Sequence, residues 1–212
     1  MAHFCIRLYD CIGVDLLVSC LSRRYSAGIR IGEVVNPPSN MFSPLSGKKI
    51  LLGVSGSIAA YKAVLLLRQL RARGASVKVI LTESAQKFVG QATFEGLGAV
   101  VETQMWGGPG EKHVALAAWA DLVVVAPLTA QLLTKMVQGQ AADLLSATLL
   151  CTRAPVYCAP AMHPSMWSHP ATSANAAIAQ SRGVTLIGPV VGEVASGDVG
   201  LGRMAEPERI VS

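Results

Sequence analysis

Polar residues that could bind an anion follow a short apolar run near residue 50. Gly56 lets the backbone come close to a ligand, and Ser57 offers its hydroxyl and amide at the start of the next helical segment. Unpaired N–H groups and the helix dipole favour a negative charge at such a position. Thr82 and Ser84 follow the next apolar run and could bind the same anion, or Thr82 could cap a helix. The pattern favours a phosphate site, although a Gly-Ser turn before a helix is often only a tight turn.

The spacing of the glycines narrows the class of ligand. Residues 53–58 do not place glycines as the dinucleotide fingerprint G-x-G-x-x-G requires, and no acidic residue ends the second apolar run to hold a ribose. The lysine of the Walker pattern is absent as well. A mononucleotide such as FMN therefore fits this segment better than NAD or ATP.

Three histidines, His113, His163 and His169, are candidates for acid–base chemistry because imidazole titrates near neutral pH. His113 precedes an apolar segment, residues 114–119, that indicates burial. From spacing alone, a single histidine in such a segment is more often structural than catalytic. The five cysteines include no C-x-x-C pair and no histidine at ligand spacing, so we expect no metal site and no disulfide framework.

The composition of the chain limits the classes of protein to which it can belong. The chain has 212 residues, is 51% hydrophobic and has a mean hydropathy of +0.45, which predicts one substantial core. Its apolar runs are shorter than the roughly 20 residues of a membrane-spanning helix. The net charge of +5 is spread along the chain without a basic patch interleaved with aromatics, which argues against nucleic-acid binding. We expect a soluble cytoplasmic protein that binds neither membrane nor nucleic acid.

The elements that must position these residues alternate between strands and helices from Lys48 onward. Short runs that are apolar on both faces, separated by helical segments, are typical of a parallel sheet covered on both sides. The predicted fold is α/β, a Rossmann-like or flavodoxin-like single domain over residues 48–212. The expected strands are 50–54, 77–81, 122–126, 156–159 and 184–187, and the expected helices are 58–73, 84–89, 130–138 and 173–182.

Ligands of open parallel sheets bind beyond the carboxyl ends of the strands. Four segments end strands there, residues 55–57, 82–84, 127–129 and 160–163, so we expect them to converge on one edge. Residues 1–47 differ from the rest and are interpreted as an N-terminal extension with a proline-containing linker over 36–44. Met41 is an alternative translation start; if the extension is translated, its best role is a short helix on a neighbouring subunit.

Several segments between Lys48 and Val211 carry, in order, the pattern of one family. They are residues 53–62, 82–85, His113 with 119–121, 126–131, Gly139 with 143–145, 160–167 and 196–204. In these segments the chain resembles the homo-oligomeric flavin-containing cysteine decarboxylases. That family includes phosphopantothenoylcysteine decarboxylases and enzymes that oxidatively decarboxylate the C-terminal cysteine of ribosomally made peptides.

The resemblance implies the cofactor, the mechanism and the site residues. FMN would take a hydride equivalent from the cysteinyl CH2–S⁻ group, and the resulting thioaldehyde would release CO2. His113, from a neighbouring subunit of a trimer or of a dodecamer of trimers, would assist deprotonation or stabilise charge, and His163 would face the departing carboxylate. The implied FMN-binding residues are Gly56, Ser57, Ile58, Thr82, Ser84, Pro127, Leu128, Thr129, Ala130, Gln131, Ala161 and Met162; the implied substrate-binding residues are His163, Met166, Trp167, Ser196, Gly197, Arg203 and Met204.

Two departures from the family pattern bear on the substrate. His163 stands where the family has the asparagine that recognises the substrate carboxylate, and imidazole can still donate a hydrogen bond there. Ser196 stands where phosphopantothenoylcysteine decarboxylases have the cysteine that helps return the intermediate to the saturated thiol. A serine hydroxyl is a poor proton donor for that step. These departures favour an oxidative decarboxylase of peptides with a C-terminal cysteine that releases an aminoenethiol.

Three alternatives stay open from the sequence. The first is a phosphopantothenoylcysteine decarboxylase of coenzyme A biosynthesis, against which Ser196 and the lack of a following synthetase domain count. The second is a non-catalytic flavin-binding regulatory subunit, which the replacements at 163 and 196 favour and the presence of His113 disfavours. The third, a flavin prenyltransferase, fits the segments around His113 and residues 160–167 less well.

Overall fold

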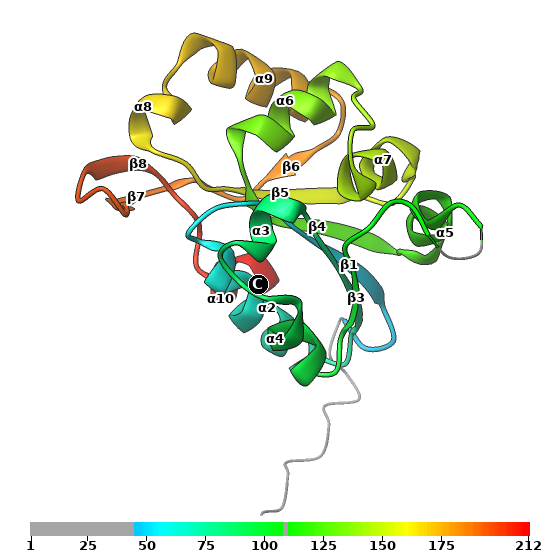
Figure 1. Cartoon of the computed structure of the whole chain (residues 1–212). Coiled ribbons are helices and arrows are strands. Elements are labelled where there is room, and N and C mark those ends of the chain that lie inside the picture. Colours follow the sequence, from blue (N-terminus) through cyan, green and yellow to red (C-terminus); the bar gives the residue numbers. More distant parts are fainter. Residues whose placement is uncertain (1–44, 108–109) are drawn as a thin grey trace, which may run out of the picture. The chain divides into compact units, whose positions relative to one another are not determined.

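The computed structural model describes residues 45–107 and 110–212 of the chain, so the predicted N-terminal extension lies outside the described residues except for residues 45–47. At its centre is a six-stranded parallel sheet of order β3-β2-β1-β4-β5-β6 (Figure 1). This order confirms the predicted Rossmann-like fold, and its direction reverses between β1 and β4. The strands of the sheet are β1 (Lys49–Val54), β2 (Ser76–Leu81), β3 (Val100–Glu102), β4 (Leu122–Leu128), β5 (Val156–Pro160) and β6 (Thr185–Leu186).

Helices cover both faces of the sheet, as the apolar strands predict (Figure 1). One face packs on α2 (Ala60–Ala72), α4 (Gln91–Gly96) and α10 (Pro207–Val211), with Phe94 and Leu66 fully buried between the layers. The other face packs on α5 (Lys112–Trp119), α6 (Ala130–Gln138), α7 (Leu144–Cys151) and α9 (Pro170–Ser181). The short helices α3 (Glu83–Gln86) and α8 (Pro164–Trp167) follow β2 and β5. Within the described residues, no helix is long and apolar enough to cross a membrane.

Residues 184–187, which the sequence predicted as the last strand, are followed by two further strands. After β6, strands β7 (Val190–Glu193) and β8 (Val199–Arg203) form a separate antiparallel hairpin. Val191 and Val199 are 71% and 73% exposed, while the inward-facing positions of β8 are Gly200 and Gly202. The large apolar side chains therefore do not mark the inward face, and the sequence gives no strong alternating pattern. Helix α9 also begins three residues earlier than expected, at Pro170, because the side chain of His169 caps it.

The hairpin is joined to the domain at its root, the part of β8 next to residues 162–164. The N–H of Met162 donates to the carbonyl oxygen of Gly202 over 3.0 Å. A Cβ on Gly202 would lie 2.3 Å from the carbonyl oxygen of Met162, so only glycine allows the two backbones to come this close. Gly200 lies in the same way against the ring of Pro164. The root of the hairpin is therefore fixed by backbone contacts.

A buried lysine holds the end of the hairpin on α2. Lys62 is 4% exposed, and its Nζ donates to the carbonyl oxygen of Met204 over 3.0 Å and to Glu206 Oε1 over 2.9 Å. Arg203 contacts the same carboxylate oxygen over 2.8 Å. The hydrogen bond from Lys62, helped by that from Arg203, lowers the pKa of Glu206 below its usual value.

Glu206→Gln is expected to lower the free energy of unfolding at pH 7 by up to about 1 kcal/mol, because the carboxylate is half exposed. The folded pKa lies below the unfolded one, so the pair stabilises above the unfolded pKa and this contribution is lost as the pH falls through the folded pKa. Urea unfolding of the variant and the wild type should differ at pH 7 and converge once the pH falls below the folded pKa of Glu206. Glu208→Gln, which removes a carboxylate bonded to Gln69 alone, is the matched control. Equal stabilities of the Glu206 variant and the wild type at pH 7 would contradict this role.

Candidate functional site

The loops after β1 and β4 meet where the strand order reverses. Ser55 directly follows β1, is 3% exposed, and donates from its Oγ to the carbonyl oxygen of Pro127 over 2.8 Å. The N–H of Thr129 in turn donates to Ser55 Oγ over 3.2 Å. Ser55 thus fixes the distance between the two loops. Sequence reasoning missed this role, although a serine directly after a buried strand and beside Gly56 was a signal for it.

Gly56 lies against the loop that follows β2. A Cβ built on it would lie 2.4 Å from the Cβ of Ser84 and 3.0 Å from the carbonyl carbon of the same residue. Real side chains do not come this close, so a larger residue at 56 would push the two loops apart. The group close to Gly56 in the structure is Ser84, another predicted cofactor-binding residue, and the approach of this backbone to a ligand stays a prediction.

Two hydroxyls around these loops cap helices, and a third accepts a hydrogen bond in the turn before α2. Thr82 Oγ1 accepts from the N–H of Ala85, and Thr129 Oγ1 accepts from the N–H of Leu132, at the starts of α3 and α6. Ser57 Oγ accepts from the N–H of Ala59 just before α2. A hydroxyl that accepts through a lone pair keeps its own O–H as a donor. All three hydroxyls can therefore accept these backbone hydrogen bonds and still donate to an anion.

These loops enclose a first cavity of about 550 Å³, which is within the usual size of cofactor sites. Its wall also contains Lys135, whose Nζ lies 2.6 Å from Asp143 Oδ2. Burial alone would raise the pKa of Asp143, but hydrogen bonds from Lys135 and from the N–H of Ser146 outweigh it and lower the pKa. The predicted cofactor-binding residues in this wall are Gly56, Ser57, Thr82, Ser84, Thr129, Ala130, Gln131, Ala161 and Met162.

The other predicted cofactor-binding residues lie elsewhere. Ile58 lines the second cavity, described next, and is 59% exposed. Leu128 is fully buried in the core, and Pro127 is also buried and takes part through its carbonyl oxygen, which accepts from Ser55. Met166, predicted to bind substrate, instead lines the first cavity.

A second cavity, of about 610 Å³, lies between α2, the loop after β5 and the hairpin. It shares Ser57, Ala161 and Met162 with the first cavity, so a ligand in one borders a ligand in the other. Four predicted substrate-binding residues line it, whereas Trp167 and Gly197 line neither cavity. The four are His163, Ser196, Arg203 and Met204.

His163 is bonded to the tip of the hairpin. Its Nε2 lies 2.8 Å from Asp198 Oδ2, and its Nδ1 accepts from the N–H of Ser165 over 3.1 Å. Ser196 Oγ donates to the same Asp198 oxygen over 2.7 Å. The hydrogen bond from His163, followed by that from Ser196, lowers the pKa of Asp198. Asp198 thus joins His163 to Ser196, the two residues that depart from the family pattern. No sequence pattern indicated this contact.

His113 lies in neither of these cavities. It is half-buried in the first turn of α5, a helix that packs on α7 and holds Trp119 under Lys78 Nζ, 4.6 Å from the ring centroid. In Figure 1, α5 lies across the domain from α8 and the β7–β8 hairpin. The described part of one chain therefore does not bring His113 together with His163.

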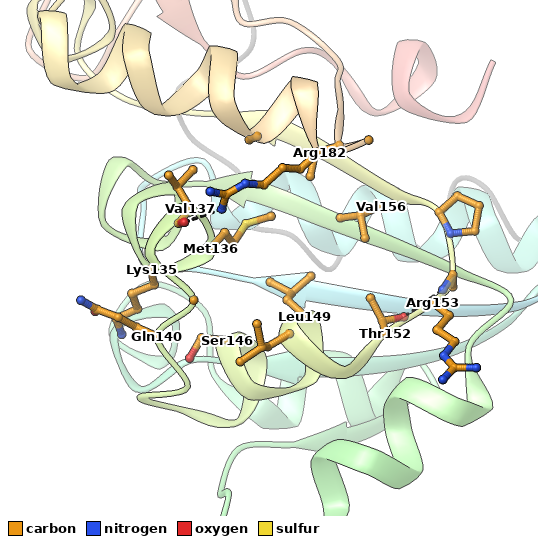
Figure 2. A pocket seen from close by; sticks show the side chains of 17 residues that line it. Lys135, Met136, Val137, Gln140, Ser146, Leu149, Thr152, Arg153, Val156 and Arg182 are labelled. Atoms are coloured by element: carbon orange, nitrogen blue, oxygen red, sulfur yellow. Dashed lines mark hydrogen bonds between the residues drawn. The ribbon is translucent and has the colours of Figure 1, made fainter.

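A third cavity, of about 540 Å³, is formed by the ends of α6, α7 and α9 and the start of β5 (Figure 2). Its cations do not converge on one point. Arg182 Nη1 donates to the carbonyl oxygen of Val137 over 2.5 Å, and Lys135 is paired with Asp143. Figure 2 shows Arg153 and Lys135 at opposite ends of the cavity. This arrangement is unlike an acid–base or anion site, and the first two cavities remain the candidate site.

The chain is similar to known proteins in sequence and in fold. A family described as "Flavoprotein" matches residues 39–212. The coenzyme A biosynthesis bifunctional protein CoaBC of Mycolicibacterium smegmatis is 50% identical over 167 residues, which is 78% of this chain but only 40% of that protein. The chain thus corresponds to less than half the length of this relative.

Two solved structures are similar in fold and sequence. One is a mutant phosphopantothenoylcysteine (PPC) decarboxylase complexed with pantothenoylaminoethenethiol; it has a TM-score of 0.73 and 33% identity over 78% of this chain and 94% of that one. The other is the FMN-dependent cysteine decarboxylase SpaF, with a TM-score of 0.67 and 32% identity over 74% of this chain and 91% of that one.

Proposed function

Because the chain belongs to the Flavoprotein family, we propose that it binds FMN in the first cavity and decarboxylates a cysteine-bearing substrate held in the second. The observation that carries this proposal is the wall that the two cavities share at Ser57, Ala161 and Met162. A ligand under the hairpin would then lie directly beside a ligand in the loops. A redox cofactor must lie in contact with the carbon that it oxidises, and this arrangement allows it.

The residues of the first cavity fit a flavin mononucleotide. The close contact between Gly56 and Ser84, which leaves no room for a Cβ on residue 56, holds the two sides of this cavity together, and the hydroxyls of Ser57, Thr82 and Thr129 keep donors for a phosphate. Bound there, FMN would accept two electrons from the CH2–S group of the substrate and pass them on to the product or to O2. The chain itself would orient the substrate, exclude water under the hairpin and hold the carboxylate.

For the substrate we favour 4′-phosphopantothenoylcysteine. The sequence alone favoured a peptide with a C-terminal cysteine, but the 50% identity to CoaBC and the likeness to the PPC decarboxylase support the alternative better. A peptide substrate stays the second candidate, supported by Ser196 and by the likeness to SpaF. Both candidates present the same group to His163, a carboxylate on the carbon next to CH2–S.

His113 would act in the site of a neighbouring copy. Since α5 lies away from α8 and the hairpin within one chain, a catalytic His113 needs a second copy of the chain to meet the substrate. Imidazole there would assist removal of a proton from the substrate or stabilise its developing charge. We therefore propose a homo-oligomer, a trimer or an assembly of trimers, as the active form.

The test is a decarboxylation assay on the yellow holoprotein. It is incubated with 4′-phosphopantothenoylcysteine and, separately, with a peptide that ends in cysteine, and the products are followed by mass spectrometry. Loss of CO2 from the first supports our assignment, and loss from the peptide alone supports the second candidate. A protein that binds FMN and changes neither substrate would be a flavin-binding regulatory subunit, and the proposed reaction would be wrong.

Ser196→Cys is expected to change the product. With serine at 196 the substrate should lose CO2 and two hydrogens, because a hydroxyl is too weak an acid to protonate the carbon of an enethiolate. A thiol, with a pKa of about 8.5, can donate that proton, so the variant should lose CO2 alone. Ser181→Cys, which adds a thiol on the exposed end of α9, is the control. The same product from the wild type and the Ser196 variant would contradict the role of this position.

A further inference from the structure

The hydrogen bonds of His163 fix its tautomer. Its Nδ1 accepts from the N–H of Ser165, so Nδ1 carries no proton in this arrangement. The proton of the neutral ring is then on Nε2, which donates to Asp198 Oδ2 over 2.8 Å. A proton on Nδ1 would face the N–H of Ser165 and remove the hydrogen bond that caps α8. His163 therefore offers one donor to the second cavity, and Asp198 occupies it.

Asp198 has no other charged partner among the described residues. Arg203 and Lys62, the cations that line the second cavity, both bind Glu206 instead. In the same part of the chain, the one further side-chain donor to Asp198 is Ser196 Oγ, which binds the same oxygen over 2.7 Å. Asp198 is itself 60% exposed, so its carboxylate can return to water at little cost.

We propose that Asp198 takes the place of the substrate's carboxylate on His163 until the substrate displaces it. This inference rests on the proposed function, since it assumes a substrate with a carboxylate in the second cavity. One N–H makes a strong hydrogen bond to one carboxylate at a time, so the two acids compete. The negative charge of Asp198 adds a repulsion that a substrate anion meets on entry.

The proposal also explains what the hairpin does when the substrate enters. The root of the hairpin is fixed by the contact between Gly202 and Met162, whereas its tip, residues 194–198, is bonded to α8 through His163 and Asp198. Displacement of Asp198 lets the tip reposition around the substrate, while the root keeps the hairpin over the second cavity. Asp198 thus sets the affinity for the substrate through His163 and is not a catalytic residue.

Asp198→Asn is the first test. The amide keeps the shape and an acceptor for His163 but loses the charge, so the KM for 4′-phosphopantothenoylcysteine should fall about fivefold while kcat does not rise. If the wild type turns over only the cysteine-terminated peptide, that peptide is the probe. An unchanged or increased KM would overturn the proposal, because the carboxylate would then not compete with the substrate.

A double-mutant cycle separates the contact from a general effect of charge. In a His163→Asn background the shorter side chain does not reach Asp198, so Asp198→Asn should leave KM within about twofold of that background. The same fall of roughly fivefold in both backgrounds would contradict competition at His163 and indicate long-range repulsion alone.

A second readout does not depend on turnover. With ¹⁵N-labelled histidine, the holoprotein should show His163 as the Nε2–H tautomer, and Asp198→Asn should shift the Nε2 resonance while Nδ1 stays an acceptor. A different tautomer, or no shift in the variant, would overturn the contact. If the wild type decarboxylates neither substrate while the shift is seen, the proposed reaction fails and the contact stands.

Discussion

His113→Asn is expected to give a yellow protein that has lost decarboxylation. Acid–base groups contribute about 10²- to 10⁴-fold to turnover, and we expect a loss in that range. The FMN content should stay at the wild-type level because His113 lines neither cavity of its own chain. Absorption spectra measure the flavin, and mass spectrometry measures the product. A variant that keeps wild-type turnover would overturn the role given to this residue.

Mixed oligomers show whether His113 acts in a neighbouring copy. His113→Asn is co-expressed with Gly56→Val, which keeps His113 but should not bind the cofactor. A working site needs a cavity with Gly56 from the His113→Asn copy and His113 from the Gly56→Val copy. Each is present in half of the copies, so random mixing should restore roughly a quarter of the wild-type activity. No activity in the mixture, although each variant folds and co-purifies with the other, would contradict a site shared between copies.

Gly56→Ala is expected to abolish or greatly weaken cofactor binding. Its new Cβ would lie 2.4 Å from the Cβ of Ser84, and relieving that overlap moves the two loops that form the first cavity. Overpacking of this kind costs about 1–3 kcal/mol, which corresponds to a loss of affinity of roughly fivefold to 150-fold. The affinity is measured by titrating the apoprotein with FMN while flavin fluorescence is monitored.

Gly90→Ala is the matched control for this substitution. Gly90 has a φ of −71°, which any residue adopts, and nothing lies within 4 Å of a Cβ built on it. The control should bind FMN like the wild type, and thermal unfolding of both apoproteins separates loss of binding from loss of the fold. If Gly56→Ala bound FMN with wild-type affinity, the first cavity would not be the flavin site.

The elements with local signals could be predicted from the sequence. Helix α6 has the predicted bounds of 130–138, because Thr129 caps its start and Gly139, at φ +69°, ends it. Strands β1, β2, β4 and β5 could be predicted from their short apolar runs, because strands that are buried on both faces are apolar throughout and need no alternation. Four loops at one edge then followed from the topology.

Other features could not be predicted because they depend on distant parts of the chain. The β7–β8 hairpin is held by contacts with residues 162–164, well before it in the chain, and its own exposed valines carry no periodic signal. The bond between His163 and Asp198 spans 35 positions and escapes local patterns for the same reason. The resemblance implied a role for His113, but no pattern in one chain could show that α5 lies away from the cavities.

The fixed root of the hairpin limits how related chains can diverge. Gly202 leaves no space for a side chain beside Met162, a residue that belongs to the walls of both cavities, so insertions there would disturb both cavities. The tip at residues 194–198 has no such restraint apart from one hydrogen-bonded carboxylate. Changes in loop length at the tip can therefore alter which cysteine derivative is admitted while the cofactor chemistry is inherited unchanged.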